Sequence, residues 1–287
     1  MSTTNAQRDL YEIYCEAMPR YPIAYEHFSD ILNSDNSRIF TAENGGTVVG
    51  FCVVDRNSVV MLCVKNEYRH CGYGKHLLMT AEKFISASYD EVILGGSGLC
   101  QGVPCDNDEE SSVPFFEKQG YSAEWTSVNM GLTLNDKTAS ILESTPHPDS
   151  IAYRFATAND REKLLAAVKD AQSDWLPIFW ENVDTPVLLA VCGDEIAGFE
   201  MVEEDGGIFF SDTAKHGMIG CVGVTHKYRR RGIGLAMTAE GSLSLYKRNC
   251  KDIQLLYVER VAWYNKLGYE VTSRQWMGRK KISDIIS

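Results

Sequence analysis

Residues 222–234 read VGVTHKYRRRGIG, and this stretch decides the fold. A short apolar segment, a basic cluster and two glycines follow one another, and a helical composition continues to residue 249. A helix N-terminus presents unpaired N–H groups and a partial positive charge. Gly232 and Gly234 leave room for a phosphate to approach the backbone, and three successive arginines before them add positive charge. The stretch therefore predicts an anion cradle between a strand and a helix.

The same pattern occurs once earlier in the chain. VKNEYRHCGYG at 64–74 matches VTHKYRRRGIG at 224–234. FEKQGY at 116–121 matches YNKLGY at 264–269, and VGF at 49–51 matches AGF at 197–199. Three matches in the same order indicate two related copies. We predict an N-terminal domain over 1–134, a polar linker over 135–150 and a C-terminal domain over 151–287.

The second copy shows its elements more clearly than the first. Their order is β-α-α-β-β-β-α-β-α-β, which predicts an α/β (α+β) fold of two tandem domains, each a mixed, mostly antiparallel sheet flanked by helices. In the first copy nothing before the first predicted helix, 7–18, has the pattern of a strand. The predicted helices of the second copy are 161–171, 175–180, 232–249 and 261–267, and its strands are 151–156, 187–191, 195–202, 218–224, 253–258 and 270–278.

Composition narrows the possible partners and location. The 287 residues carry a net charge of −11, and residues 1–143 hold 20 acidic against 10 basic residues. This acidity argues against non-specific binding to nucleic acid. No apolar run reaches the ~20 residues of a membrane helix, and the N-terminus has no signal-peptide pattern. Nine cysteines without a C-x-x-C pair indicate reduced thiols and no metal site. We expect a cytoplasmic protein with no nucleic-acid or membrane partner.

The glycine pattern excludes the common nucleotide-binding motifs and resembles another. There is no G-x-x-x-x-G-K-[ST] loop, and Met237 and Leu77 stand where G-x-G-x-x-G needs its third glycine. Both copies resemble the [QR]-x-x-G-x-[GA] loop that holds the acetyl-CoA pyrophosphate in the GNAT N-acetyltransferase superfamily. YNKLGY at 264–269 is similar to the closing helix of that family. The resemblance covers nearly the whole chain and implies a tandem, two-domain member.

The resemblance assigns roles to residues of the second copy. Tyr264 stands where the family's tyrosine protonates the leaving thiolate; the alternative is an aromatic packed in the core. The strand backbone at Val222, Gly223 and Val224 corresponds to the pantetheine site. The pyrophosphate site corresponds to Arg229, Arg230, Arg231, Gly232, Ile233, Gly234 and Leu235.

The first copy departs from the family at one decisive position. Phe116 replaces the tyrosine, so we expect this copy to be a non-catalytic scaffold. A second CoA site remains possible there, because the matching loop residues are present. They are Val64, Arg69, Gly72 and Gly74.

The general base is not evident from the sequence. Many family members use a glutamate on the strand before the loop, and Met218 occupies that position here. Glu200 and His216 are the candidates that we retain, since histidine has an unperturbed pKa near about 6.5. Asp212 and Glu259 are further candidates. For any one of the four, a solvated hairpin residue is the favoured interpretation, and an amine that is already partly neutral needs no dedicated base.

These features predict an acyl-CoA-dependent N-acyltransferase. The expected reaction transfers acetyl from acetyl-CoA to a primary amine of a small molecule or a peptide N-terminus. Trp175, Phe179 and Trp180 either enclose the acceptor or belong to the core. Pairing of the two copies makes a monomer plausible, and a dimer is possible. The alternatives are a non-catalytic CoA- or acyl-CoA-binding sensor or interaction module, and an enzyme with a longer acyl or an aminoacyl donor.

Overall fold

The computed structural model describes residues 3–96, 102–106 and 111–283, which form two compact units. Unit 1 contains 1–127, 208–212 and 273–287, and unit 2 contains 128–207 and 213–272. The units are therefore not the two contiguous halves that the sequence repeat predicts. Each unit includes chain from both copies.

Unit 1 is a five-stranded sheet in the order β1-β2-β3-β4-β13. Helices α1 and α2 cover one face, where Ile13 and Phe28 pack with Phe51 of β2. Helix α3 covers the other face, where Leu77 packs with Cys52. The elements are α1 (Thr3–Ala17), α2 (Tyr25–Leu32), β1 (Ser37–Asn44), β2 (Thr47–Asp55), β3 (Ser58–Val64), η1 (Asn66–Tyr68), α3 (Tyr73–Ile85), β4 (Glu91–Leu94), β5 (Val103–Pro104), α4 (Val113–Lys118) and β13 (Arg279–Lys281).

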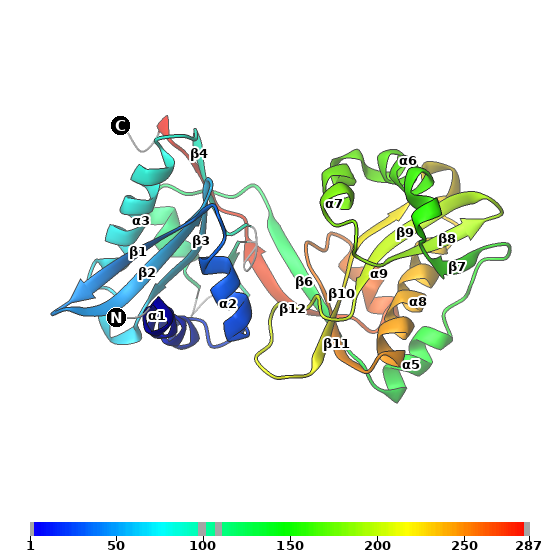
Figure 1. The fold of residues 1–287 in the computed structure, drawn as a ribbon, viewed down its shortest axis with the longest axis horizontal. Helices are drawn as coiled ribbons and strands as arrows, with labels where there is room; N and C mark the ends of the chain where they lie inside the picture. The colour runs from blue at the N-terminus through cyan, green and yellow to red at the C-terminus, as the bar shows by residue number, and fades with distance from the viewer. Residues whose placement is uncertain (1–2, 97–101, 107–110, 284–287) are drawn as a thin grey trace. The chain divides into compact units, whose positions relative to one another are not determined.

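Unit 2 is built on a sheet in which β6, β11, β10, β9, β8 and β7 are successive neighbours, and β12 lies beside β6. Helices α6 and α7 lie on one face, and α8 and α5 lie on the other (Figure 1). Strands β10 and β11 pair in parallel, whereas the pairs β11–β6, β10–β9, β9–β8 and β8–β7 are antiparallel. The elements are β6 (Thr126–Thr133), α5 (Asp136–Glu143), β7 (Ala152–Phe155), η2 (Ala158–Asp160), α6 (Arg161–Gln172), η3 (Ser173–Trp175), α7 (Leu176–Glu181), β8 (Val187–Cys192), β9 (Glu195–Glu203), β10 (Lys215–Val224), η4 (His226–Tyr228), α8 (Ile233–Lys247), β11 (Cys250–Leu255), α9 (Val261–Tyr264), η5 (Asn265–Leu267) and β12 (Glu270–Trp276).

The predicted fold class is confirmed, because each unit has a mixed sheet flanked by helices. In the described residues of the first copy, helix α1 comes first and no strand precedes it, as its sequence pattern indicates. No helix in the described part of the chain combines the length and apolar character needed to cross a bilayer.

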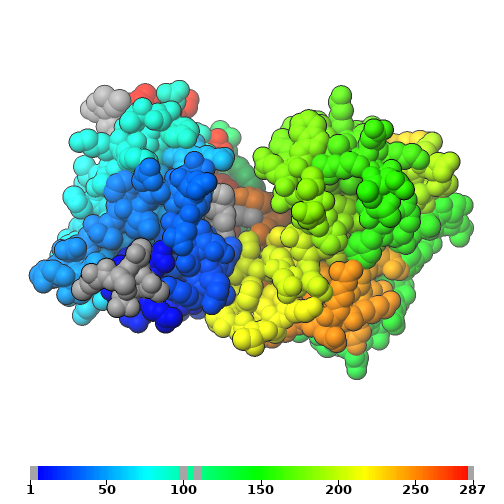
Figure 2. Space-filling model, in the orientation of Figure 1, coloured from blue at the N-terminus to red at the C-terminus, as the bar shows by residue number. Residues whose placement is uncertain are grey.

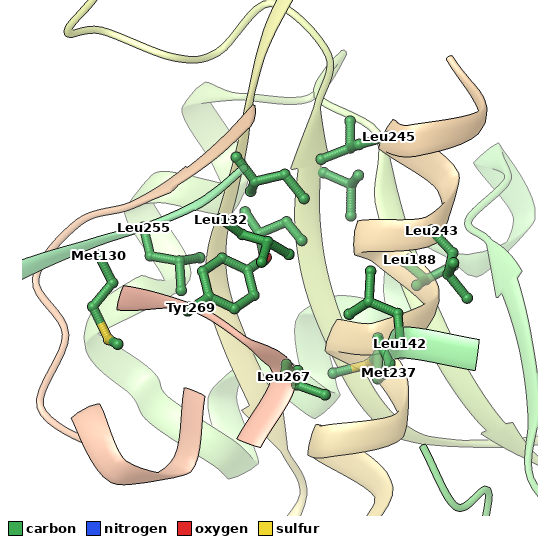
Figure 3. Close-up of a cluster of buried hydrophobic side chains, with 14 of the residues drawn as sticks. Met130, Leu132, Leu142, Leu188, Met237, Leu243, Leu245, Leu255, Leu267 and Tyr269 are labelled. Carbon is green, nitrogen blue, oxygen red and sulfur yellow. The ribbon is translucent and has the colours of Figure 1, made fainter. Parts of the chain in front are cut away.

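The two copies exchange their last strands. Strand β6, from the first copy, pairs with β11 in unit 2, and its Met130 and Leu132 are buried in the core there (Figure 3). Strand β13, from the end of the chain, pairs with β4 in unit 1, with Lys280 opposite Val92. Neither sheet is thus complete within one copy.

The residues predicted to form a linker, 135–150, include a helix of unit 2. Asn135 caps helix α5 through a reciprocal capping box with Thr138. Leu142 of this helix is fully buried against α8 and the sheet (Figure 3). The segment therefore contributes to the core as well as connecting the copies.

Candidate active site

Strand β10 leaves its neighbour β11 part-way along its length. The two strands pair only as far as Met218, which lies opposite Gln254, although β10 continues to Val224. On its other side β10 still pairs with β9, since Gly223 lies opposite Phe199. The end of β10 therefore borders an opening in the sheet, and the residues predicted to bind the pantetheine arm, 222–224, lie in this part of the strand.

A β-bulge interrupts β10 in the part of the strand that no longer pairs with β11. Gly220 lies opposite Met201 and Gly223 opposite Phe199, so that Cys221 and Val222 share one partner position. Cys221 has a φ of 51°, a left-handed conformation that is uncommon for a residue with a side chain. A bulge bends the strand and leaves an extra residue outside the regular ladder. In β3 of unit 1 no residue has a positive φ.

The loop after β10 is held by Arg229. Its Nε donates to the carbonyl of Val224 at 3.0 Å, and its Nη2 donates to the carbonyl of Ala171, at the end of α6, at 2.9 Å. In unit 1 Arg69 makes the same pair of contacts, to Val64 at 3.4 Å and to Ala17 at 3.2 Å. The arginine of the motif therefore fixes the loop in both units. Its contact with a cofactor stays a prediction.

The two glycines of the loop are required for different reasons. Gly232 has a φ of 79° and precedes the first residue of α8 without any side-chain cap, so the N–H groups of the first turn stay available to a ligand. Gly234 has an ordinary φ, but a Cβ there would lie 3.2 Å from the ring of Trp263 and 3.3 Å from Val224. Gly232 thus serves the turn, and Gly234 allows α9 to pack against the start of α8.

The basic residues of the loop differ in their contacts. Lys227 pairs with Glu195 at 2.6 Å. Arg231 donates to the carbonyl of Lys227 at 3.1 Å and lies over the ring of Tyr228. Arg230 is exposed, and within the described ranges no residue pairs with its guanidinium. Arg230 is therefore the loop cation most available to an anionic ligand.

Tyr264 ends helix α9 beside the same loop, because its neighbour Trp263 contacts Gly234. Its ring is half-buried and lies edge-on to that of Trp263, with 4.6 Å between the ring centroids. No described residue forms a hydrogen bond with its hydroxyl. Burial raises the pKa of the Tyr264 phenol above its usual range. The charge of Glu200 adds to this increase, and the charge of Arg260 opposes it. The hydroxyl therefore stays protonated at neutral pH and can donate a proton.

Comparison with known proteins identifies this architecture. Residues 35–123, which belong to the first copy, match the family model described as an acetyltransferase (GNAT) domain. A tandem GNAT protein from the clavulanic acid biosynthesis pathway superposes with a TM-score of 0.72 at 14% identity, over 98% of this chain and 96% of that one. This chain has the fold of a tandem GNAT protein.

Two other solved GNAT structures are similar over nearly all of the chain. A GCN5-related N-acetyltransferase from Sphaerobacter thermophilus has a TM-score of 0.73 at 21% identity, covering 96% of this chain and 92% of that one. The glucosamine N-acetyltransferase region of a fungal multidomain β-N-acetylglucosaminidase has a TM-score of 0.79 at 19% identity. That match covers 98% of this chain but spans only 37% of the fungal one. Among proteins with curated descriptions, none matches this sequence.

The first copy keeps the glycine turn of the loop but has fewer basic residues there. Gly72 has a φ of 91° before α3, in the same place as its counterpart in unit 2. Its loop carries Glu67, His70 and Cys71 where the second loop has a lysine and two arginines. Phe116, at the tyrosine position, is buried in the core of unit 1.

Glu200 is fully buried on the face of the sheet that α8 covers. Its Oε2 accepts a hydrogen bond from Thr238 at 2.9 Å, and its Oε1 has no partner. A Cβ at Gly241 would fall directly on Oε1, so the helix passes close above the carboxyl group. Burial raises the pKa of Glu200 to about 8, which keeps the group neutral at pH 7. A carboxyl group that is neutral and covered by a helix is poorly placed to take a proton from the substrate amine.

His216 lies at the beginning of β10, where β10 and β11 are still paired. Its side chain is 3% exposed, and its Nδ1 lies 3.0 Å from Asp252 of β11. Six residues separate it from Val222, which is roughly 20 Å along a strand. The other two candidates lie elsewhere: Asp212 belongs to unit 1, and Glu259 is exposed in the turn before α9.

One acidic residue that the sequence pattern did not single out lies beside β10. Glu203 ends β9 directly opposite Met218. Its position can be found only from the pairing of β9 with β10, because an irregular segment of 204–214 separates the two strands in sequence.

The aromatic residues before β8 divide into core and surface. Phe179 is buried and packs edge-on to Phe199, with 5.3 Å between centroids. Trp175 is half-buried and lies 6.4 Å from the same ring. Trp180 is 59% exposed. Helices α6 and α7, green in the space-filling view, form part of the surface of unit 2 (Figure 2). Phe179 is thus a core residue, and the two tryptophans are accessible to different extents.

The described residues contain no group of three or more His, Cys, Asp or Glu that would hold a metal ion.

Proposed function

We propose that this protein transfers an acetyl group from acetyl-CoA to a primary amine, and that unit 2 contains the catalytic site. The acceptor is a small molecule or the N-terminus of a peptide. The observation that carries the proposal is the phenol of Tyr264, which forms no hydrogen bond with a described residue and lies beside the loop that follows β10. Unit 1 has a buried phenylalanine in the corresponding position.

The loop of unit 2 fits the pyrophosphate of a CoA thioester. Gly232 opens the turn with a left-handed backbone, and the helix that follows has no side-chain cap to compete with an anion. Exposed Arg230 adds a charge that can approach a phosphate. In unit 1 the corresponding positions carry less positive charge, which supports unit 2 as the principal site.

Each chemical step has a residue of this chain to support it. The pantetheine arm lies along the free edge of residues 222–224, which brings the thioester toward the bulge at Cys221. The amine nitrogen attacks the thioester carbon, a C–N bond forms and the C–S bond breaks. Tyr264 donates its proton to the departing sulfur. A general acid in hydrogen-bond reach typically accelerates such a step by about 10²–10⁴-fold.

Unit 1 then serves as a scaffold that keeps a GNAT fold without the acid. A non-catalytic CoA-binding module remains the second candidate, because Met218 supplies no base on the strand before the loop. The two proposals differ in one measurable property, which is turnover. Location in the cytoplasm and a monomeric state are also part of our proposal.

The experiment is acetyl transfer over a panel of amines, followed through the release of free CoA. The panel includes glucosamine, since a fungal relative of similar fold is a glucosamine N-acetyltransferase, together with simple alkyl amines and short peptides. Tyr264→Phe should lower kcat at least tenfold and leave acetyl-CoA affinity unchanged, because only the hydroxyl is removed. Wild-type kcat in this variant would exclude Tyr264 as the acid, and binding without turnover on any amine would favour the module.

A further inference from the structure

Glu203 shares one face of the unit 2 sheet with the bulge of β10. It lies opposite Met218, and residues directly opposite in an antiparallel pair project to the same side. Phe199 and Met201, the alternate residues of β9, pack in the cluster beneath α6 and α7. Cys221, in the bulge, packs against the same cluster. Glu203 therefore faces the α6–α7 side, the opposite side from α8.

Among the described residues, none pairs with the carboxylate of Glu203. Neighbouring acids are engaged, since Glu195 pairs with Lys227 and Glu204 pairs with Lys215. Glu203 is half-buried, and no described residue forms a hydrogen bond or ion pair with it. A partly desolvated carboxylate without a cation is unfavourable unless a ligand supplies one. The site thus has the character of a receptor for a cation.

The chain turns back close to Glu203 at Gly206. A Cβ at Gly206 would lie 2.7 Å from the Cβ of Glu203 and 3.0 Å from that of Met218. Only a glycine lets the chain turn back so closely over these two side chains. Cys221 is the titratable neighbour in the bulge, and its thiol pKa is raised to about 11 by burial and then by the charge of Glu203. The carboxylate is therefore close to the strand segment where the proposed thioester lies.

We propose that Glu203 binds the acceptor as a primary ammonium and accepts its proton. This inference rests on the proposed function, and it names both the acceptor's charge and the base. Three residues of β10 separate Met218 from Cys221, a span of about 10 Å that a glutamate side chain and a bound ammonium can bridge together. Burial raises the pKa of Glu203 above its usual value, which makes it a stronger base than an exposed carboxylate.

The proton balance is complete with residues already described. One proton moves from the ammonium to Glu203 and leaves a neutral amine. The amine attacks the thioester carbon, and the sulfur takes the proton of Tyr264 as the C–S bond breaks. The second nitrogen proton returns to the Tyr264 oxygen, and Glu203 releases its proton to water. The products are a neutral amide, free CoA and one proton in solution.

The test compares Glu203→Gln with Glu204→Gln, a matched change at the adjacent carboxylate. For an alkyl ammonium acceptor at pH 7, Glu203→Gln should lower kcat/KM at least 100-fold, with the KM for acetyl-CoA unchanged. Glu204→Gln should stay within twofold of wild type. The loss should shrink at high pH, and also for an amine whose own pKa is near 7, because a neutral amine needs no base.

Two results would overturn the inference. One is wild-type kcat/KM in Glu203→Gln across the pH range. The other is a loss of equal size for neutral and cationic amines, which indicates a merely structural role. If Glu203→Gln does not fold, as judged by circular dichroism, Glu203→Asp must show the same dependence on amine pKa. Failure of the proposed function is distinct, because the wild-type protein then acetylates no amine of the panel.

Discussion

Replacement of Glu200 by glutamine should stabilise the protein in a pH-dependent way. The carboxyl group is fully buried, its Oε1 has no partner, and burial raises its pKa to about 8 from 4.5. Between these two values the unfolded chain is ionised at this residue while the folded chain stays protonated. The folded state therefore binds more protons than the unfolded state, and stability falls as pH rises.

The size of the effect follows from the two pKa values. For each pH unit between the two pKa values, the free energy of unfolding falls by about 1.4 kcal/mol. The contribution of Glu200 to the free energy of unfolding should thus fall by about 2–3 kcal/mol between pH 5 and pH 7. Glu200→Gln keeps the shape and the hydrogen bond from Thr238 but cannot ionise. We expect variant and wild type to be similar at pH 5 and the variant to be about 2–3 kcal/mol more stable at pH 7.

Urea unfolding at pH 5, 6 and 7 measures this difference directly. Groups common to both proteins cancel in the comparison, so the variant-minus-wild-type curve isolates Glu200. Glu162→Gln, at an exposed position on α6, is the control and should give a flat difference. A flat difference for Glu200→Gln as well would show that the buried carboxyl group is not held neutral, and the reasoning would be wrong.

Two further predictions concern the cofactor loop and the exchanged strands. Gly232→Glu should abolish acetyl-CoA binding in a calorimetric titration, because it adds a negative charge at a left-handed position of the proposed phosphate site. The control is Gly193→Glu, at a left-handed turn of the β8–β9 hairpin with open space around it. This variant should bind acetyl-CoA normally. Unchanged affinity in the first variant would refute the placement of the pyrophosphate. Residues 151–287 expressed alone should lack cooperative unfolding by circular dichroism, since β6 and α5 are missing from the core, and co-expression with 1–150 should restore it. A cooperative transition of the isolated segment would contradict this dependence.

Sequence patterns predicted the elements well because their signals are local. The alternation of apolar residues, the glycines and the repeat all lie within short stretches, and the strand, loop and helix around 222–234 follow from them. The tyrosine difference between Tyr264 and Phe116 is also visible by direct comparison of the copies. In the structure Phe116 is buried in the core of unit 1.

Pairing between distant strands was not predictable in the same way. Nothing in the residues of β6 indicates that they pair with β11 rather than with β4, since an antiparallel edge of either sheet satisfies the same pattern. The position of Glu203 opposite Met218 depends on the hairpin register across an irregular segment. The contacts of Arg229 were not predictable either. A basic residue before a phosphate-binding loop suggests a contact with the ligand, whereas in the structure Arg229 donates hydrogen bonds to two backbone carbonyls.

The exchange of strands also affects the order in which the protein is made. Strand β4 ends at Leu94, but its partner β13 begins at Arg279, so the ribosome must add about 185 residues before that edge can pair. At about 5–20 residues per second this takes roughly 10–40 s. During that time the edge of β4 is a free template for other strands. Unit 1 therefore cannot complete its sheet before residues 279–281, which follow the second copy's proposed catalytic segment in sequence, have been synthesised.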